Sequence, residues 1–246
     1  MSKKNKICIK RLISDINEIS KEYMPNIHIW YDENKITSIK ALIIGPDDTP
    51  YQDGFYFFSI EIPKTYPFES PSAKFETIND NIRFNPNLYE RGKVCLSILG
   101  TWSGPKWTSV QTLKSLLLSI QSLLDENPIN NEPGFDKVSK DDKRALSYNE
   151  YIRYHNYNFA IYNMLVNNKF PYFNDVIEKY FVENYEKLKN ELIKYQCLDN
   201  NNYKTFIWCH SVKVNYTELL EKYEILYKKL EKKDFSHVKN TSVHTN

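Results

Sequence analysis

The sequence predicts an α+β fold, in which helices cover one face of an antiparallel sheet. Three observations support this prediction: an amphipathic helical pattern comes first, four β-branched or aromatic segments follow it, and helical patterns return in the second half of the chain. Of the 246 residues, 41% are hydrophobic and 15% aromatic, so the chain can bury a full core. We therefore expect one large domain, or one domain with an extension.

A first helix is expected over residues 5–22, where isoleucine and leucine recur at helical spacing among charged side chains. Strands are expected at residues 26–33, 36–45, 54–63 and 72–78, because these segments are rich in β-branched and aromatic residues. Clusters of Asp, Asn, Gly and Pro separate them, as turns between strands require. The sequence therefore predicts a four-stranded antiparallel meander.

A long irregular segment runs from Asn79 to Lys106 and shows neither helical nor strand periodicity. Segments of this length without secondary structure are usually functional or disordered. This one contains apolar residues such as Val94, Ile98 and Trp102, which are too frequent for a disordered linker. We therefore expect an ordered loop that packs against the domain.

A central helix is predicted next, because apolar residues from Val110 to Leu124 fall on one helical stripe. Thr108 or Ser109 is the expected N-cap, and the helix should end before Pro128. It is the most apolar helix that the sequence predicts.

Three more helical patterns follow, at about residues 139–168, 172–195 and 213–233. The first two carry many Tyr and Phe residues, and the third is charged and amphipathic. The polar run "LDNNNYK" after Cys197 is expected to be a linker.

The charge balance excludes some classes of partner. Lys and Arg number 33 and Asp and Glu number 31, so the net charge of +2 favours neither nucleic acid nor an anionic membrane as a partner. The longest apolar run, residues 113–124, is too short and too polar to cross a bilayer. The four cysteines form no CxxC pair and no signal peptide precedes them, which favours the cytoplasm, and also allows the nucleus.

No bound metal or nucleotide is expected. The five histidines have no metal-ligand spacing, and the pair Cys209-His210 alone is a weak signal. The sequence contains neither GxxxxGK[ST] nor GxGxxG, so no phosphate-binding loop is predicted.

Cys95 lies in the run "NPNLYERGKVCLSILGT" (residues 85–101), eight residues after Asn87, and no histidine occurs between His28 and His155. A cysteine hydrolase needs a histidine within hydrogen-bond reach, so His28 or His155 would have to approach Cys95. The alternative without function is a small buried hydrophobic residue, as free cysteines usually are.

Several motifs together resemble those of the ubiquitin-conjugating enzymes. They are "YPFESP" after the third strand, "NPN" eight residues before the loop cysteine, and a tryptophan with a helix after it. The longer string "NPNLYERGKVCLSILGTWSGPKW" is most similar to the Z-type branch of that family. The resemblance covers roughly residues 5–165 and implies a catalytic core there with the ubiquitin-conjugating (UBC) fold. Residues 166–246 would form a C-terminal helical extension.

The resemblance implies that Cys95 accepts ubiquitin or a ubiquitin-like modifier from an activating enzyme as a thioester. A lysine amine of a protein substrate, or a cysteine of a ubiquitin ligase, would then take the modifier. Thioester exchange needs no strong general base, because thiolates attack and leave with similar ease. The role requires a sulfur that a peptide tail can reach, and no cofactor, since the activating enzyme uses the ATP. A catalytically silent ubiquitin-binding scaffold is the alternative, although such variants generally lack the cysteine.

The family resemblance assigns further roles near Cys95. Asn87 would donate its side-chain amide to the oxyanion that forms on transfer, or would brace the loop as a turn residue. Most members have His where this chain has Asn85, which leaves one structural hydrogen bond open. Asn130 and Asn131, with Glu132, stand where many members place an acidic residue that helps the acceptor lysine.

Four residues are candidates for contacts with other proteins. Trp102 lies in "GTWSGP", a longer loop than in the commonest members, which could select the modifier or the ligase or be a tolerated insertion. Phe68 in the Pro-rich loop resembles the ligase-binding surface. Lys10 and Arg11 resemble the basic face that meets the activating enzyme, with a solvated helix face as the alternative.

Overall fold

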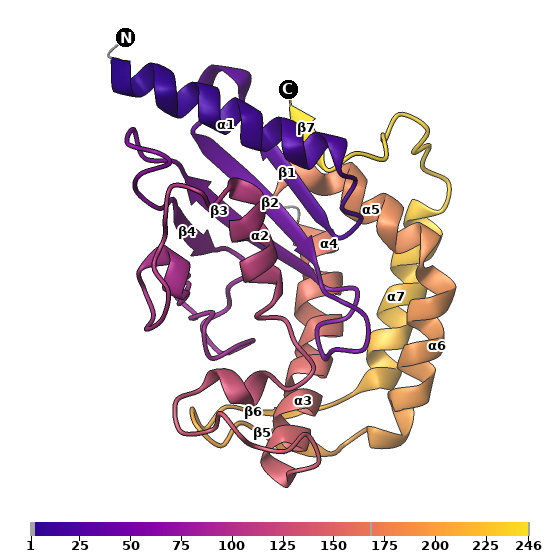
Figure 1. Ribbon diagram of the computed structural model, residues 1–246. Coiled ribbons are helices and arrows are strands. Elements are labelled where there is room, and N and C mark those ends of the chain that lie inside the picture. Colours follow the sequence, from indigo (N-terminus) through magenta and orange to yellow (C-terminus); the bar gives the residue numbers. More distant parts are fainter. Residues whose placement is uncertain (1–2, 168, 246) are drawn as a thin grey trace.

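The predicted meander is present in the computed structural model, which describes residues 3–167 and 169–245 (Figure 1). The first elements are α1 (Lys3–Lys21), β1 (Ile27–Tyr31), β2 (Ser38–Ile44), β3 (Phe55–Glu61) and β4 (Ser72–Phe75). Neighbouring strands pair antiparallel in chain order, from β1 to β4. Both the α+β class and the UBC arrangement of an N-terminal helix before the meander are confirmed.

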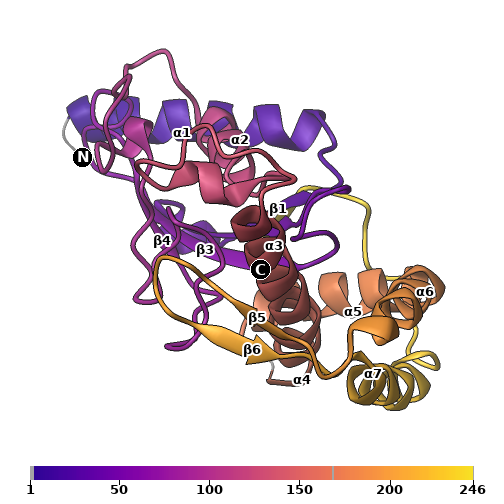
Figure 2. The ribbon, with the colours of Figure 1, turned by 90° about the horizontal axis from the view of Figure 1, so that it is seen from below.

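The sheet is covered on both faces. The helices α1 and α2 (Leu113–Gln121) lie together on one side of it (Figure 2). On the other side, the ring of Trp30 stacks on Tyr172 with centroids 3.8 Å apart, and Phe57 stacks on Phe170 at 4.0 Å. Residues after 167 therefore bury much of the sheet face that α1 and α2 leave open.

The central helix α2 begins later than the sequence predicted. Its N-cap is Thr112, whose hydroxyl accepts the backbone N–H of Ser115, while the Ser115 hydroxyl accepts the N–H of Thr112. This reciprocal capping box satisfies two N–H groups that Thr108 or Ser109 could not reach from their positions. Val110, placed on the apolar stripe by the sequence, therefore precedes the helix and is 81% exposed.

The C-terminal helices are more broken than expected. They are α3 (Lys143–His155), a π-helical segment (Asn156–Asn163), α4 (Met164–Asn167), α5 (Asn174–Glu183), α6 (Tyr185–Tyr195) and α7 (Tyr216–Leu230). The first starts after Asp142, whose carboxylate accepts the N–H of Arg144 as an N-cap. The pattern at 172–195 predicted one helix, but Asn184 separates two.

The description of residues 166–246 as a helical extension was incomplete, because three short strands occur there. The expected linker after Cys197 contains β5 (Asn202–Lys204), which pairs with β6 (Ser211–Lys213) as a hairpin. The strand β7 (Val243–Thr245) pairs parallel with β1 and closes that edge of the sheet. Three-residue strands are too short to give an alternating pattern in the sequence.

The extension is joined to the core by direct contacts as well as by the chain. The strand order is β4-β3-β2-β1-β7, so the last strand in the sequence lies beside the first. The backbone N–H of Met24 donates to the hydroxyl of Ser242 at 2.9 Å. Within the described ranges, no helix has the length and apolar character needed to cross a bilayer.

Candidate active site

Cys95 lies in the long loop between β4 and α2, which is held in place by backbone bonds. Its N–H donates to the carbonyl oxygen of Asn87 at 2.9 Å. Isolated bridges pair Leu88 with Asn85 and with Val94, so the chain on either side of the turn runs antiparallel. Asn87 and Cys95, which the family resemblance assigns to one site, are therefore neighbours in the structure.

The sulfur is less accessible than its expected role requires. Cys95 is 1% exposed, whereas Cys197 and Cys209 are exposed. The expectation of an openly reachable sulfur is therefore wrong for this conformation. Cys95 nevertheless lies outside the contiguous apolar core, to which the flanking Val94 and Ile98 belong.

The segment after Cys95 folds back on it through Thr101. The Thr101 hydroxyl donates to the carbonyl oxygen of Val94 at 2.7 Å and accepts the N–H of Leu96 at 2.9 Å. These two bonds hold the backbone on both sides of Cys95 and tie residue 101 to it. The exposed run that follows, residues 101–106, contains Trp102, which is 37% exposed.

Asn85 organises the turn that carries Asn87. Its side chain is fully buried, and its Nδ2 donates to the hydroxyl of Tyr51 at 3.0 Å and to the carbonyl oxygen of Leu123 at 2.7 Å. Its Oδ1 accepts the N–H of Asn87 at 2.8 Å. Although most members of the family have a histidine at this position, the Asn85 amide makes structural hydrogen bonds in this chain.

Asn87 has a different environment from Asn85. Its side chain is 5% exposed, and its Oδ1 is buried without a hydrogen-bond partner among the described residues. A buried amide oxygen without a partner is costly to a fold, so it is unusual unless the group has another use. No structural bond through that oxygen fixes the amide.

Asp125 is an acidic group hydrogen-bonded to one of the predicted acceptor residues, and the sequence analysis missed it. Asn131 donates to Asp125 at 3.1 Å, and the Asn127 N–H donates to it at 2.8 Å. Burial raises the pKa of Asp125, and these two hydrogen bonds oppose the shift. The Oδ1 of Asn130 is buried without a partner among the described residues. Burial also raises the pKa of Glu132.

Phe68 and Arg11, two of the contact residues predicted for other proteins, lie near the start of α2. Phe68 is 71% exposed. The next residue back, Pro67, accepts the indole N–H of Trp107 at 2.7 Å, which ties the Pro-rich loop to the segment before α2. The Phe68 ring therefore projects into solvent from a loop that is held in place.

Lys10 and Arg11 differ in what they contact. Lys10 is exposed. Arg11, by contrast, forms an ion pair with the buried Asp15 at 2.8 Å and donates to the carbonyl oxygens of Ser109 at 3.0 Å and Gln111 at 2.8 Å. The structure thus gives Arg11 an internal role, joining α1 to the segment before α2, that the sequence did not predict.

Neither histidine that a hydrolase would need contacts Cys95. His28 lies on β1, 3.3 Å from His244, and burial followed by that neighbour lowers the pKa of His28 to about 4. His155 packs against the rings of Tyr151 and Tyr154. Across residues 3–167 and 169–245, no three His, Cys, Asp or Glu side chains are grouped as a metal ion would require.

Comparison with known proteins agrees with this geometry. The family model "Ubiquitin-conjugating enzyme" matches residues 11–156. The chain is 45% identical over 182 residues to ubiquitin-conjugating enzyme E2 Z of Xenopus tropicalis, covering 73% of this chain and 58% of that one. It is 44% identical over 183 residues to the Homo sapiens protein of that name, covering 73% and 51%. The chain therefore spans about half the length of these relatives.

Proposed function

Because this chain belongs to the ubiquitin-conjugating enzyme family, we propose that it carries ubiquitin or a ubiquitin-like modifier as a thioester on Cys95. An activating enzyme supplies the modifier, and a lysine amine or a ligase cysteine receives it. The observation that carries the proposal is the hydrogen bond between the Cys95 N–H and the Asn87 carbonyl, at 2.9 Å. It holds a cysteine and an amide donor on one short turn with no histidine beside them.

The charging step suits a cysteine without a base. The Cys95 thiolate attacks the thioester carbonyl on the activating enzyme, the new C–S bond forms, and the activating enzyme's thiolate leaves. The two thiolates have similar leaving ability, so proton abstraction by a neighbour contributes little. This chemistry separates the proposal from a hydrolase, in which water must be activated.

Asn87 is proposed to act in the transfer step. Attack of an amine on the thioester places negative charge on the carbonyl oxygen, and an amide N–H aimed at that oxygen stabilises it. The Asn87 side chain makes no hydrogen bond to another described residue, so its Nδ2–H groups are available to donate to this oxygen. A buried surrounding strengthens the effect, since water does not compete for the charge.

The acceptor lysine must be neutral to attack, although its pKa in water is near 10.4. Desolvation lowers the pKa of the lysine, so that more of the amine is neutral and able to attack. We propose that the segment from Asp125 to Asn131 receives the lysine, with Asn130 and Asn131 as positioning groups. The unpaired Oδ1 of Asn130 is an acceptor with no other use among the described contacts.

Charging requires that the cover over Cys95 opens. The Thr101 bonds to the residues on either side of Cys95 are the contacts that must break, and they lie in an otherwise exposed segment. Opening a segment of this kind costs far less than global unfolding. Trp102, one residue further on, is proposed to meet the modifier or the ligase once the segment has moved.

The proposed partners are the modifier, an activating enzyme, a ubiquitin ligase and protein substrates, with neither nucleic acid nor a membrane among them. Phe68 is proposed as the ligase contact, and Lys10 rather than Arg11 as the residue that meets the activating enzyme. No cofactor is required, because ATP is consumed upstream. Free cysteines at positions 8, 95, 197 and 209 support a reducing compartment, the cytoplasm or the nucleus.

One observation favours a second candidate, a ubiquitin-binding scaffold without activity. It is the 1% exposure of Cys95, which a scaffold could retain without consequence. The experiment that separates the two is incubation with activating enzyme, ATP and modifier, followed by gels with and without reductant. An adduct that reductant removes supports the enzyme. Its absence with every activating enzyme, while the modifier still binds without covalent attachment, supports the scaffold.

A further inference from the structure

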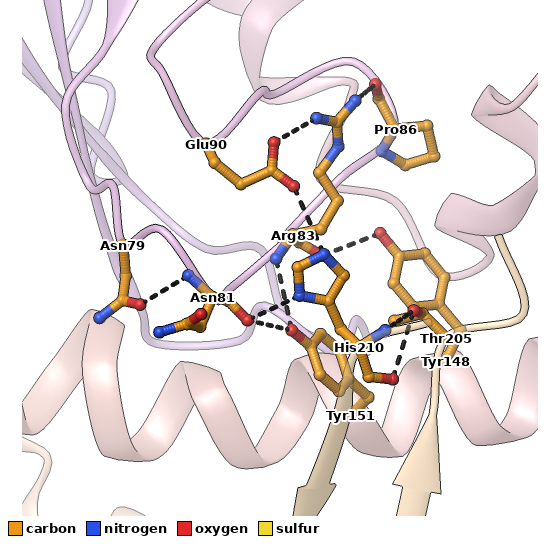
Figure 3. A network of polar contacts seen from close by, with 9 residues as sticks. All are labelled: Asn79, Asn81, Arg83, Pro86, Glu90, Tyr148, Tyr151, Thr205 and His210. Carbon is orange, nitrogen blue, oxygen red and sulfur yellow. Dashed lines mark hydrogen bonds and ion pairs between the residues drawn. The ribbon is translucent and has the colours of Figure 1, made fainter. Parts of the chain in front are cut away.

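The β5–β6 hairpin of the C-terminal segment docks on the loop that precedes Cys95 (Figure 3). Where β5 ends, next to the hairpin tip, the hydroxyl of Ser147 on α3 donates to the carbonyl oxygen of Lys204 at 2.9 Å and accepts the Lys204 N–H at 3.1 Å. At its tip, the Thr205 N–H donates to the carbonyl oxygen of His210 at 2.9 Å. The Nδ1 of His210 lies 3.0 Å from the carbonyl oxygen of Asn81, so this nitrogen carries a proton and donates it.

Arg83 is the residue that the hairpin tip reaches. Its side chain is 4% exposed, and its guanidinium lies 3.7 Å from the ring centroid of Tyr89 and 4.9 Å from that of Trp208 in the hairpin. One Nη forms an ion pair with Glu90 at 2.7 Å, and the other donates to the carbonyl oxygen of Pro86 at 2.8 Å. These contacts hold both Nη atoms of the buried guanidinium, whose Nε has no hydrogen-bond partner among the described residues.

His210 lies near the same ion pair. Its Nε2 lies 3.8 Å from one carboxylate oxygen of Glu90, while the other oxygen pairs with Arg83 (Figure 3). The hairpin therefore meets this loop at two points, through the Trp208 ring over Arg83 and through the His210 imidazole bonded to Asn81.

The bond from Arg83 to Pro86 acts on the peptide group that precedes Asn87. The carbonyl oxygen of this peptide accepts from Arg83 at 2.8 Å, and its N–H donates to the Asn85 Oδ1 at 2.8 Å. Because a peptide group is planar, bonds at both ends fix its orientation. This plane sets the N–Cα bond of Asn87, and the bond from the Cys95 N–H holds the carbonyl on its other side, so the two together set the direction in which the Asn87 side chain leaves the backbone.

We propose that the hairpin tip positions Asn87 for the transfer step by holding Arg83 against the carbonyl of Pro86. Trp208 and His210 are positioning residues in this arrangement, and they touch neither modifier nor acceptor. The inference rests on the proposed function, since it assigns the hairpin to the step in which Asn87 acts. It gives the C-terminal segment a part in the chemistry of the N-terminal half.

The test separates charging from transfer. Full-length protein is charged with modifier, the charging is quenched, and the loss of the adduct to free lysine is timed. Trp208→Ala should slow this loss about fivefold, a coupling typical of residues in one network, and leave the extent of charging unchanged. Trp208→Phe keeps a ring over Arg83 and should restore most of the rate. Phe206→Ala, on the same tip but 57% exposed, is the matched control and should transfer as the wild type does.

The route through Asn87 is tested by a double-mutant cycle. In an Asn87→Ala background, Trp208→Ala should cause no further loss of transfer rate. An equal fivefold loss in both backgrounds would overturn the inference, as would an equal loss in Phe206→Ala. A parallel fall in charging and transfer would also overturn it, because that result indicates general destabilisation.

Amide hydrogen exchange gives a readout that needs no activity. The N–H groups of Asn87 and Cys95 should exchange faster in Trp208→Ala than in the wild type or in Phe206→Ala. If no activating enzyme charges Cys95, the proposed function fails, and the exchange result still decides whether the hairpin braces this turn. Unchanged exchange at both amides would contradict the bracing itself.

Discussion

The backbone N–H of Cys95 donates to the carbonyl oxygen of Asn87 at 2.9 Å, so the proposed nucleophile and the proposed oxyanion donor share one turn. Two residues earlier, Asn85 makes three hydrogen bonds that hold this turn against Tyr51 and Leu123. The two asparagines therefore differ: the Asn85 side chain fixes the loop, whereas the Asn87 Oδ1 has no hydrogen-bond partner among the described residues.

The first prediction separates these two asparagines. Asn87→Ala should charge normally but transfer to free lysine about 100- to 1,000-fold more slowly, because one lost oxyanion donor costs about 2.7–4 kcal/mol of barrier. Asn85→Ala should instead lower the free energy of unfolding by roughly 2–4 kcal/mol, since it leaves buried partners unpaired. Transfer kinetics and urea denaturation measure the two effects. Equal losses of stability in both variants would contradict the division.

The second prediction concerns the cover over Cys95. Brief alkylation of the native protein should modify Cys197 and Cys209 before Cys95, because only the first two are exposed. Thr101→Val keeps the shape of the side chain but removes its hydrogen bonds to Val94 and Leu96. It should speed alkylation of Cys95 by up to about tenfold, the equivalent of about 1.4 kcal/mol. Mass spectrometry of the peptides gives the order, and an unchanged rate at Cys95 would show that another contact holds the cover.

The third prediction separates two neighbours on α1. Arg11→Ala should lower the free energy of unfolding by about 2 kcal/mol, because the buried Asp15 loses its charged partner. Lys10→Ala should leave stability within about 0.5 kcal/mol, as exposed substitutions usually do. It should slow charging at low salt, because a charge at the rim of an interface acts mainly on the association rate. A Lys10→Ala protein that charges at the wild-type rate would remove Lys10 from the contact with the activating enzyme.

The fourth prediction is a dependence of stability on pH through His28. Burial, and then the nearby His244, lower the pKa of His28 to about 4, while hydrogen bonds to the carbonyls of Thr241 and Pro25 oppose the shift. The unfolded chain therefore binds a proton more readily than the folded chain. Stability is at its full value above about pH 6.5 and is lost as the pH falls toward 4.

Over this range, His28 alone should account for roughly 3 kcal/mol. His28→Gln keeps a polar side chain but removes the titration, so its free energy of unfolding should fall less steeply between pH 6.5 and 4. Chemical denaturation across that range measures the slope. Parallel curves for the variant and the wild type would show that His28 is protonated in the folded protein.

The sequence predicted the parts of this fold that repeat a pattern over many residues. The meander, the first helix and the central helix all have such patterns, and the motifs around Cys95 placed Cys95 and Asn87 together. The capping box at Thr112 was missed because a Thr or Ser occurs at several nearby positions and only geometry selects one. Contacts between distant segments were also missed, because nothing local marks them.

Arg83 is an example of a residue whose contacts with a distant segment could not be predicted. In the sequence it is one of 33 basic residues, yet its partners come from its own loop and from Trp208, far along the chain. The bonds of the Thr101 hydroxyl to the backbone on both sides of Cys95 were missed for the same reason. Such roles follow from tertiary structure, and no periodicity records them.

The most direct test asks which sulfur carries the modifier. A protein with Cys197→Ser and Cys209→Ser keeps Cys95 and the fully buried Cys8, and it is incubated with activating enzyme, ATP and modifier. We predict an adduct that reductant removes, and its replacement by a reductant-resistant oxyester when Cys95→Ser is added. An adduct that reductant still removes after Cys95→Ser would contradict the account.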